Sequence, residues 1–353
     1  MGGLALKSTV TRRYERNEFD AISVELLSTL EKTFKRVAMP LFYKNKPSFG
    51  DADILVSMEG CNYNMRDYIT AHFKPNEIFH NGNCWSFDYK ELQIDLITVS
   101  AEHFDSNYNY LSYNDLGNYI GKIAHGFGFK YGQEGLVYDH YFKGSNIGRV
   151  IVSKDYDKIY EFLGLDYNRW KEGFDELEDI FKFISKSKYF NWEFLQLENN
   201  NRINRERDAK RKSYMSFLEF IEDNCKDSEH QYQYDKDKSV YVDKAAEFFP
   251  ESNLITEIRR MEYEECKALY IKSKFNGGEV MRRFGLKGKE LGDVLNGFKK
   301  MMNFLIPNES YEHYIINTPS EDIYEDFKEY LNWYGKRIDY QFKNSDWVSW
   351  ISQ

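Results

Sequence analysis

The chain has 353 residues, a net charge of −9, and 42% hydrophobic and 17% aromatic residues. This length and composition predict a folded protein of two or three domains and exclude a disordered chain. The negative charge excludes a protein that grips long duplexes through a broadly basic surface, because such binding depends on neutralising phosphates. Any nucleic-acid contact is therefore expected from local basic patches.

The setting of the protein is indicated by the absence of targeting patterns. No apolar run approaches the length of a membrane span, so no membrane partner is expected. The opening Met1–Leu6 is too short and too weakly apolar for a signal peptide. The cysteines lack the CxxC spacing of a zinc site or disulfide framework; they are Cys61, Cys84, Cys225 and Cys266. We expect a cytoplasmic protein.

The first predicted element is an amphipathic helix, followed by a polar loop over residues 44–49 and a strand from Asp51 to Val56. The helix is indicated by apolar residues at three-to-four spacing: Phe19, Ile22, Leu26, Leu30, Phe34 and Val37. Side chains alternate along a strand, so Asp51 and Asp53 point to the same face. Two neighbouring carboxylates repel each other unless a cation lies between them, and oxygen ligands suit Mg²⁺.

A strand pair follows, with residues 84–89 turning into a second apolar strand over residues 92–99. Asp95 interrupts this apolar strand, where a buried charge is costly without a metal or partner. Three acids on adjacent strands suit a two-metal site for phosphoryl transfer.

The sequence Gly50–Asp51–Ala52–Asp53, its apolar continuation and the later Asp95 resemble the DNA polymerase beta nucleotidyltransferase superfamily. That superfamily includes family X DNA polymerases, CCA-adding tRNA nucleotidyltransferases and poly(A) polymerases. The resemblance implies an α+β palm with two Mg²⁺ or Mn²⁺ ions. It also implies that Asp51 and Asp53 bridge both ions, and that Asp95 binds only the ion that activates the 3′-hydroxyl.

The chain departs from the superfamily where a Gly-Ser pair usually holds the triphosphate. Here the sequence is Met39–Pro40–Leu41–Phe42, and proline has no amide hydrogen to donate. Lys44 and Lys46 are the candidates to supply positive charge, and Ser48 a hydroxyl. The cradle is thus either built differently or absent.

Residues 108–129 resemble the segment after the third aspartate in family X polymerases, where an aromatic and glycine turn meets the nucleotide. A helix is predicted from Leu116 to Ala124, and residues 130–138 fit a further strand pair. Candidate nucleotide contacts are Tyr110, Tyr113, Asn114 and Asp115. The alternative is that the aromatic residues are core and that Asn114 or Asp115 only caps the helix.

From residue 166 the patterns become helical, and residues 226–240 form the most polar stretch, predicted as a loop. Residues 202–212 contain six basic residues and two acids. The candidate nucleic-acid contacts in this run are Arg202, Arg205, Lys210 and Arg211. A solvated, salt-bridged helix is the alternative.

Residues 275–299 resemble the helical body of bacterial-type CCA-adding enzymes and poly(A) polymerases. Asn276–Gly277 is predicted to end one helix, and Gly285 and Gly288 to form a tight corner. Candidate phosphate contacts at this corner are Arg282, Arg283, Lys287 and Lys289. The alternative is a helix-corner-helix of the kind seen in many helical domains, including some that bind DNA without sequence choice.

Together these patterns predict an α+β protein with a polymerase beta-like palm, a small mixed sheet with helices, in residues 1–165. A mostly α-helical domain is predicted over residues 166–353, with a role in binding the acceptor. The expected function is metal-dependent transfer of nucleotides from nucleoside triphosphates to a nucleic-acid 3′ end, with tRNA-like RNA favoured over DNA. A family X-like DNA polymerase is one alternative. The other alternative is a non-catalytic or toxin-like nucleotidyltransferase fold that modifies or binds a protein or small molecule rather than a nucleic acid.

Overall fold

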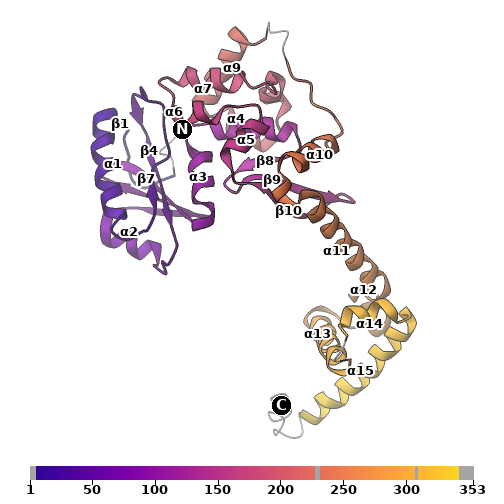
Figure 1. The fold of residues 1–353 in the computed structure, drawn as a ribbon. Coiled ribbons are helices and arrows are strands. Elements are labelled where there is room, and N and C mark those ends of the chain that lie inside the picture. The colour runs from indigo at the N-terminus through magenta and orange to yellow at the C-terminus, as the bar shows by residue number, and fades with distance from the viewer. Residues whose placement is uncertain (1–4, 227–230, 307–308, 342–353) are drawn as a thin grey trace. The chain divides into compact units, whose positions relative to one another are not determined.

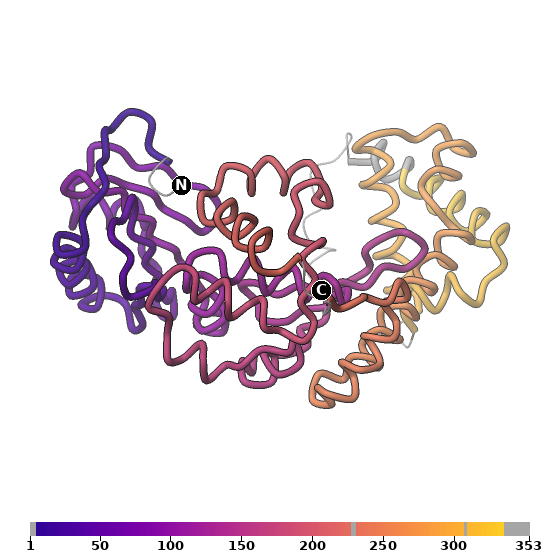
Figure 2. The backbone as a smooth tube through the Cα atoms, turned by 90° about the horizontal axis from the view of Figure 1, so that it is seen from above, coloured from indigo at the N-terminus to yellow at the C-terminus, as the bar shows by residue number. Residues whose placement is uncertain are grey.

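The computed structural model describes residues 5–226, 231–306 and 309–341, with side chains up to residue 334. The fold is mixed α+β with small sheets and many helices, which confirms the predicted class at that level. The chain divides into two compact units at residues 258 and 259. Figure 2 lets the backbone of each unit be followed by colour.

The first unit contains a five-stranded sheet in the order β2-β4-β7-β6-β5. Its strands are β2 (Val37–Ala38), β4 (Asp51–Ser57), β5 (Ile78–Asn81), β6 (Cys84–Tyr89) and β7 (Leu92–Val99). Strands β4 and β7 are parallel, and every other neighbouring pair is antiparallel. A separate pair joins β1 (Tyr14–Glu15) to β3 (Ser48–Phe49).

Helices α1 (Arg16–Leu30) and α2 (Met65–Phe73) cover one face of this sheet (Figure 1). The face is apolar because Ile54, Ile94 and Leu96 alternate with polar residues along β4 and β7, and all three are fully buried. Burial of each such side chain contributes about 1.5–3 kcal/mol. The alternation leaves the opposite face to carry the acidic residues.

The predicted first helix is confirmed up to Leu30 but not beyond it. Phe34 packs into the same core after the helix has ended, and Val37 lies in β2. The apolar spacing thus continued through a turn and into a strand, because all these side chains face one core.

Helix α3 (Phe104–Leu111) packs on the acidic face, where Phe104 joins Leu55 and Ile97 in a second apolar cluster. The chain continues through α4 (Leu116–Gly126) into a three-stranded antiparallel sheet in the order β10-β9-β8. These strands are β8 (Lys130–Gly132), β9 (Gly135–Phe142) and β10 (Ser145–Ser153), and β8 and β9 form the strand pair expected after the helix.

The rest of the first unit is helical. It comprises α5 (Tyr156–Phe162), α6 (Tyr167–Glu172), α7 (Leu177–Ser185), α8 (Arg202–Asp208), α9 (Lys212–Asn224) and α10 (Ser239–Phe248). The expected boundary at 165 and 166 therefore lies inside this unit. The reason is packing: Tyr119 of α4 lies buried against Phe181 of α7 and Phe217 of α9.

The second unit begins within α11 (Leu254–Lys274) and continues with α12 (Gly277–Phe284), α13 (Gly288–Leu305), α14 (Tyr311–Asn317) and α15 (Ser320–Gln341). Its core is built around Phe275, Phe298 and Phe327. The predicted corner is present: the Asn276 side chain caps α12, and Gly285 and Gly288 have φ of +73° and +55°. Across the described residues, every helix is too short or too polar to cross a membrane.

Asp139 on β9 is a buried carboxylate that forms ion pairs with Arg149 and Lys130. Hydrogen bonds from Arg149 lower the pKa of Asp139 to about 2. A lowered pKa means that the ionised group stabilises the fold above pH 4, and that this contribution is lost as the pH falls towards 2. Asp139→Asn should cost about 1.5–3 kcal/mol at pH 7.

Thermal unfolding from pH 7 down to pH 2 measures this effect. The difference in melting temperature between wild type and Asp139→Asn should become smaller as the pH falls. Asp157→Asn, at an exposed carboxylate, should change the melting temperature little at any pH. A gap that stays constant down to pH 2 would show that the ion pairs are not its source.

Candidate active site

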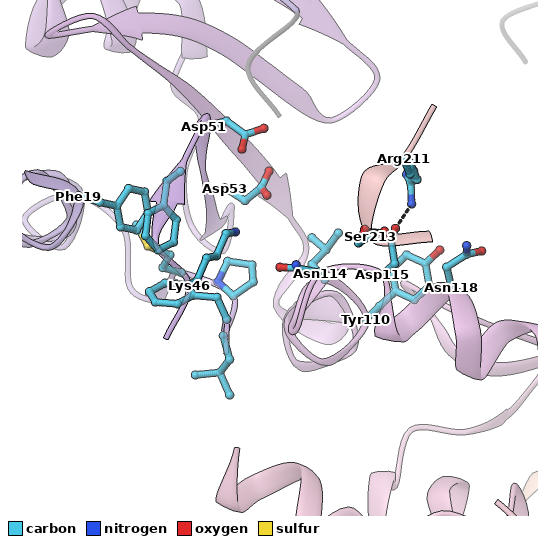
Figure 3. A pocket seen from close by; sticks show the side chains of 16 residues that line it. Phe19, Lys46, Asp51, Asp53, Tyr110, Asn114, Asp115, Asn118, Arg211 and Ser213 are labelled. Atoms are coloured by element: carbon cyan, nitrogen blue, oxygen red, sulfur yellow. Dashed lines mark hydrogen bonds and ion pairs between the residues drawn. The ribbon is translucent and has the colours of Figure 1, made fainter. Parts of the chain in front are cut away.

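The register of β4 against β7 brings the three predicted carboxylates to one face of the sheet. Asp53 lies directly opposite Asp95, and Asp51 lies opposite Gln93. Residues directly opposite each other in a sheet point to the same side. The Asp51 and Asp53 side chains lie next to each other and point the same way in Figure 3.

The segment before β4 holds these carboxylates at the edge of a cavity. Phe49 of β3 is buried and stacks on Phe19 of α1, with ring centroids 3.7 Å apart. Arg13 donates to the Ser48 hydroxyl at 3.1 Å and to its carbonyl at 2.8 Å. These contacts anchor β3, from which Gly50 leads directly into Asp51.

The cavity has a volume of about 400 Å³, within the range of small-molecule sites. Asp51, Asp53 and Lys46 line one wall (Figure 3). The facing wall is polar and comes from the chain around α3, α4 and α9: Tyr110, Asn114, Asp115, Asn118, Arg211 and Ser213.

A strained turn directs Asn114 into this cavity. Tyr113 and Asn114 both adopt left-handed backbone, with φ of +61° and +60°. Such a conformation is costly for residues other than glycine, and asparagine tolerates it best. The turn is held by Tyr113, whose amide donates to the Leu41 carbonyl at 2.6 Å and whose hydroxyl donates to the Trp170 carbonyl at 3.2 Å.

Polar contacts between α4 and the α8–α9 segment place Arg211 at the cavity. The buried Asp115 pairs with Arg211 and accepts a hydrogen bond from the Ser213 hydroxyl. One turn further along α4, Asn118 accepts a hydrogen bond from Arg207 at 3.2 Å. The Asp115 side chain is therefore used across this contact and makes no cap hydrogen bond to α4, although Asp115 occupies the N-cap position.

Crowding of negative charge dominates the electrostatics of the site. Removal from water, followed by the like charges of Asp51 and Asp95, raises the pKa of Asp53 to about 8. The Asp53 side chain is nevertheless open to solvent, although protein surrounds it closely. Repulsion from the neighbouring carboxylates is therefore the stronger cause of the raised pKa of Asp53.

Asp95 is held more tightly than Asp53. Burial raises its pKa to about 6, opposed by hydrogen bonds from Ser86 and Gln93. The Gln93 amide donates to both Asp95 oxygens, at 2.9 and 3.0 Å. Lys46 is the nearby cation: burial lowers its pKa, and the charges of Asp51 and Asp53 oppose that change.

The structure brings many, but not all, of the predicted nucleotide-site residues together. Lys46, Tyr110, Asn114 and Asp115 line the cavity with the first two aspartates. The other three lie elsewhere: Lys44 pairs with Asp175 at 2.7 Å, Ser48 is held by Arg13, and Tyr113 is buried.

The predicted basic patches have different environments. Arg211 lines the cavity, whereas Arg205 donates to the carbonyls of residues 197, 198 and 200, and Arg202 pairs with Glu206. The run is split between α8 and α9, so Lys210 lies exposed in the connection.

In the second unit, Arg282 and Arg283 both pair with Glu279, and Arg283 also pairs with Glu321. These acids compete with any phosphate for the two guanidinium groups. Lys287 and Lys289 are exposed and have no ion-pair partner among the described residues.

Asn118 and Ser213 are cavity residues that the sequence analysis missed. A signal for Asn118 was present, since it lies one helical turn after Asp115. Ser213 reaches the cavity only because α9 folds against α4, and no local pattern indicates that contact.

Within residues 5–226, 231–306 and 309–334, no three His, Cys, Asp or Glu side chains are gathered closely enough to hold a metal ion. The chemistry of the donors still fits a hard divalent cation, because Asp51 and Asp53 offer adjacent carboxylate oxygens and the charge crowding would be relieved by one. The third carboxylate, Asp95, accepts hydrogen bonds at both of its oxygens from the side-chain amide of Gln93.

Comparison with models of known protein families finds no match to this chain, and comparison with curated proteins finds none either.

The charge crowding predicts that Asp53→Asn stabilises the metal-free protein. A raised pKa in the fold means that stability is complete below the ordinary value of 3.8 and is lost as the pH rises through about 8. The variant should melt a few degrees above wild type at pH 8 in EDTA, and the gain should shrink to nothing near pH 4. Scanning calorimetry measures both.

Asp88→Asn is the matched control on the same face of the same sheet. Its carboxylate accepts hydrogen bonds from the amide and side chain of Asn76 and from the amide of Glu77, at 2.8–2.9 Å. That substitution should destabilise. Equal destabilisation by Asp53→Asn at pH 8 would contradict the assigned crowding.

Proposed function

We propose that this protein is a metal-dependent nucleotidyltransferase with a palm like that of the DNA polymerase beta superfamily. It would transfer nucleotides from nucleoside triphosphates to a nucleic-acid 3′ end. The observation that carries the proposal is the register that sets Asp53 opposite Asp95, with Asp51 on the same face, beside a polar cavity.

In the proposed reaction the acceptor's 3′ oxygen forms a bond to the α-phosphorus of the triphosphate. The bond from that phosphorus to its bridging oxygen breaks, and pyrophosphate leaves. Asp51, Asp53 and Asp95 would hold two Mg²⁺ or Mn²⁺ ions, which when bound neutralise phosphate charge and lower the pKa of the hydroxyl. Asp95, the carboxylate expected at the ion that activates the hydroxyl, would accept the hydroxyl proton.

The missing Gly-Ser pair has a replacement in this proposal. Arg211, on the wall opposite the aspartates, pairs with Asp115 through one nitrogen and would offer the rest of its guanidinium to the triphosphate. The Asn114 and Asn118 amides lie on the same wall, and Lys46 supplies a second positive charge beside the carboxylates.

An RNA acceptor is favoured over DNA. The net charge of −9 argues against nonspecific gripping of a duplex, and the helix corner in the second unit exposes Lys287 and Lys289. A preference for deoxynucleotides on DNA primers would instead favour the family X-like alternative.

The direct test is incubation with labelled NTPs or dNTPs, Mg²⁺ or Mn²⁺, and a panel of tRNA, RNA and DNA primers. Wild type should extend a 3′ end, and Asp95→Asn should lose transfer by at least a hundredfold while nucleotide binding stays measurable. Full activity in Asp95→Asn would remove the mechanism. Absence of transfer to every acceptor by wild type would favour a target other than nucleic acid.

The proposed contact of Arg211 with the triphosphate can be tested by substitution. Arg211→Gln should raise KM for the nucleotide by about tenfold or more, because one charge-assisted contact is lost. Arg211→Lys keeps the charge without the bidentate geometry, so its KM for the nucleotide should lie between those of wild type and Arg211→Gln. The control is Arg202→Gln, which removes an exposed arginine of the same run. Equal KM values in all four proteins, each with a normal melting temperature, would exclude Arg211 from the nucleotide site.

A further inference from the structure

One cross-strand row of the five-stranded sheet continues past the carboxylates to an exposed aromatic residue. In the strand register Asp53 lies opposite Asp95, Asp95 lies opposite Ser86, and Ser86 lies opposite Phe79. Side chains directly opposite each other in neighbouring strands share a face. Phe79 of β5 therefore lies on the same face as the aspartates, two strands beyond Asp95.

The rows on either side of this one are occupied by the protein itself. Leu55, Ile97 and Cys84 pack beneath α3. On the other side, the Gln93 side chain accepts a hydrogen bond from the amide of Ala5 at 2.9 Å. The residues that follow are held by Glu77, whose carboxylate accepts hydrogen bonds from the backbone amides of residues 7, 8 and 9 at 2.7–3.0 Å.

Phe79 itself is 43% exposed and has no ring partner among the described residues. Its neighbour His80, on the opposite face of the strand, stacks on Trp85 with ring centroids 3.7 Å apart. The strand thus uses one aromatic ring for its own packing and leaves the other accessible.

The row leads away from the cavity. Residues that line the cavity come from β4, the chain before it, and the region of α3, α4 and α9, whereas Phe79 lies on the edge strand at the other end of the sheet. Two substrates that meet at the aspartates can therefore approach from different sides. The cavity suits the nucleoside triphosphate, and the row beyond Asp95 remains for the acceptor.

We infer that Phe79 binds the acceptor by stacking on the unpaired base at its 3′ end; this inference rests on the proposed nucleotidyltransferase function. Strands lie about 4.8 Å apart, so two strand spacings put Phe79 about 10 Å from Asp95. That is the scale of one terminal nucleotide, with its 3′ oxygen at Asp95 and its base at Phe79. An aromatic face accepts any base, so the contact selects an unpaired end without selecting its sequence.

The test compares wild type, Phe79→Ala and Phe79→Trp with an RNA primer and a DNA primer of the same sequence. Phe79→Ala should raise KM for the acceptor by about tenfold, the usual effect of losing one stacked base. KM for the nucleotide and kcat at saturating acceptor should stay within twofold of wild type. Phe79→Trp should restore the acceptor KM, because it restores an aromatic face.

Tyr141→Ala is the matched control, since Tyr141 is an exposed aromatic residue on β9, in the other sheet of the unit. It should leave both KM values unchanged. Acceptor KM values for Phe79→Ala equal to those of wild type on both primers would overturn the inference and leave the proposed function standing.

Binding of the primers in the absence of nucleotide, followed by fluorescence anisotropy, separates this inference from the proposed function. Weaker binding by Phe79→Ala than by wild type and Tyr141→Ala supports a stacking contact even if no transfer is detected. Equal binding by all three proteins removes it. The melting temperature of Phe79→Ala should match wild type, because the ring makes no packing contact with another ring.

Discussion

The parallel pairing of β4 with β7 is the constraint on which the rest of this structure depends. It sets Asp53 opposite Asp95 and buries the alternate residues Ile54 and Leu96 on the other face. A slip of one residue would move the carboxylates into the apolar core under α1 and the aliphatic side chains into water. The hydrophobic core and the charged site are therefore two results of one register, and neither can change alone.

The cost of that arrangement is visible in the acidic groups. Asp53 and Asp95 both have raised pKa values, so the folded metal-free protein holds carboxylates that resist ionisation. Carboxylates with strongly raised pKa values are typical of functional sites rather than of groups that stabilise the fold. The left-handed turn at Tyr113 and Asn114 is a second strained feature at the same cavity, and its burial against Trp170 and Phe174 maintains it.

The helical part of the first unit completes the cavity as well as the core. Asp115 and Asn118 of α4 each contact the α8–α9 segment, and those contacts carry Arg211 and Ser213 to the wall opposite the aspartates. The basic run over residues 202–212 has the pattern of a solvent-exposed surface in the sequence. In the structure its side chains have three different environments: contacts within the protein, the cavity at Arg211, and solvent. These contacts keep α8 and α9 within the first unit, which extends to residue 258 and does not end after the strands.

The amino-acid sequence by itself determined the α+β class, the strands that carry Asp51, Asp53 and Asp95, and the helix corner at Gly285 and Gly288. Each of these follows from alternation, spacing or backbone requirements within a few neighbouring residues. Only the tertiary structure decided that Arg211 faces the aspartates, that Tyr113 is core, that Lys44 and Ser48 are engaged elsewhere, and that Phe79 shares the aspartates' row. Those facts depend on contacts between segments distant in the chain, and local periodicity carries no information about which distant segment a side chain will meet.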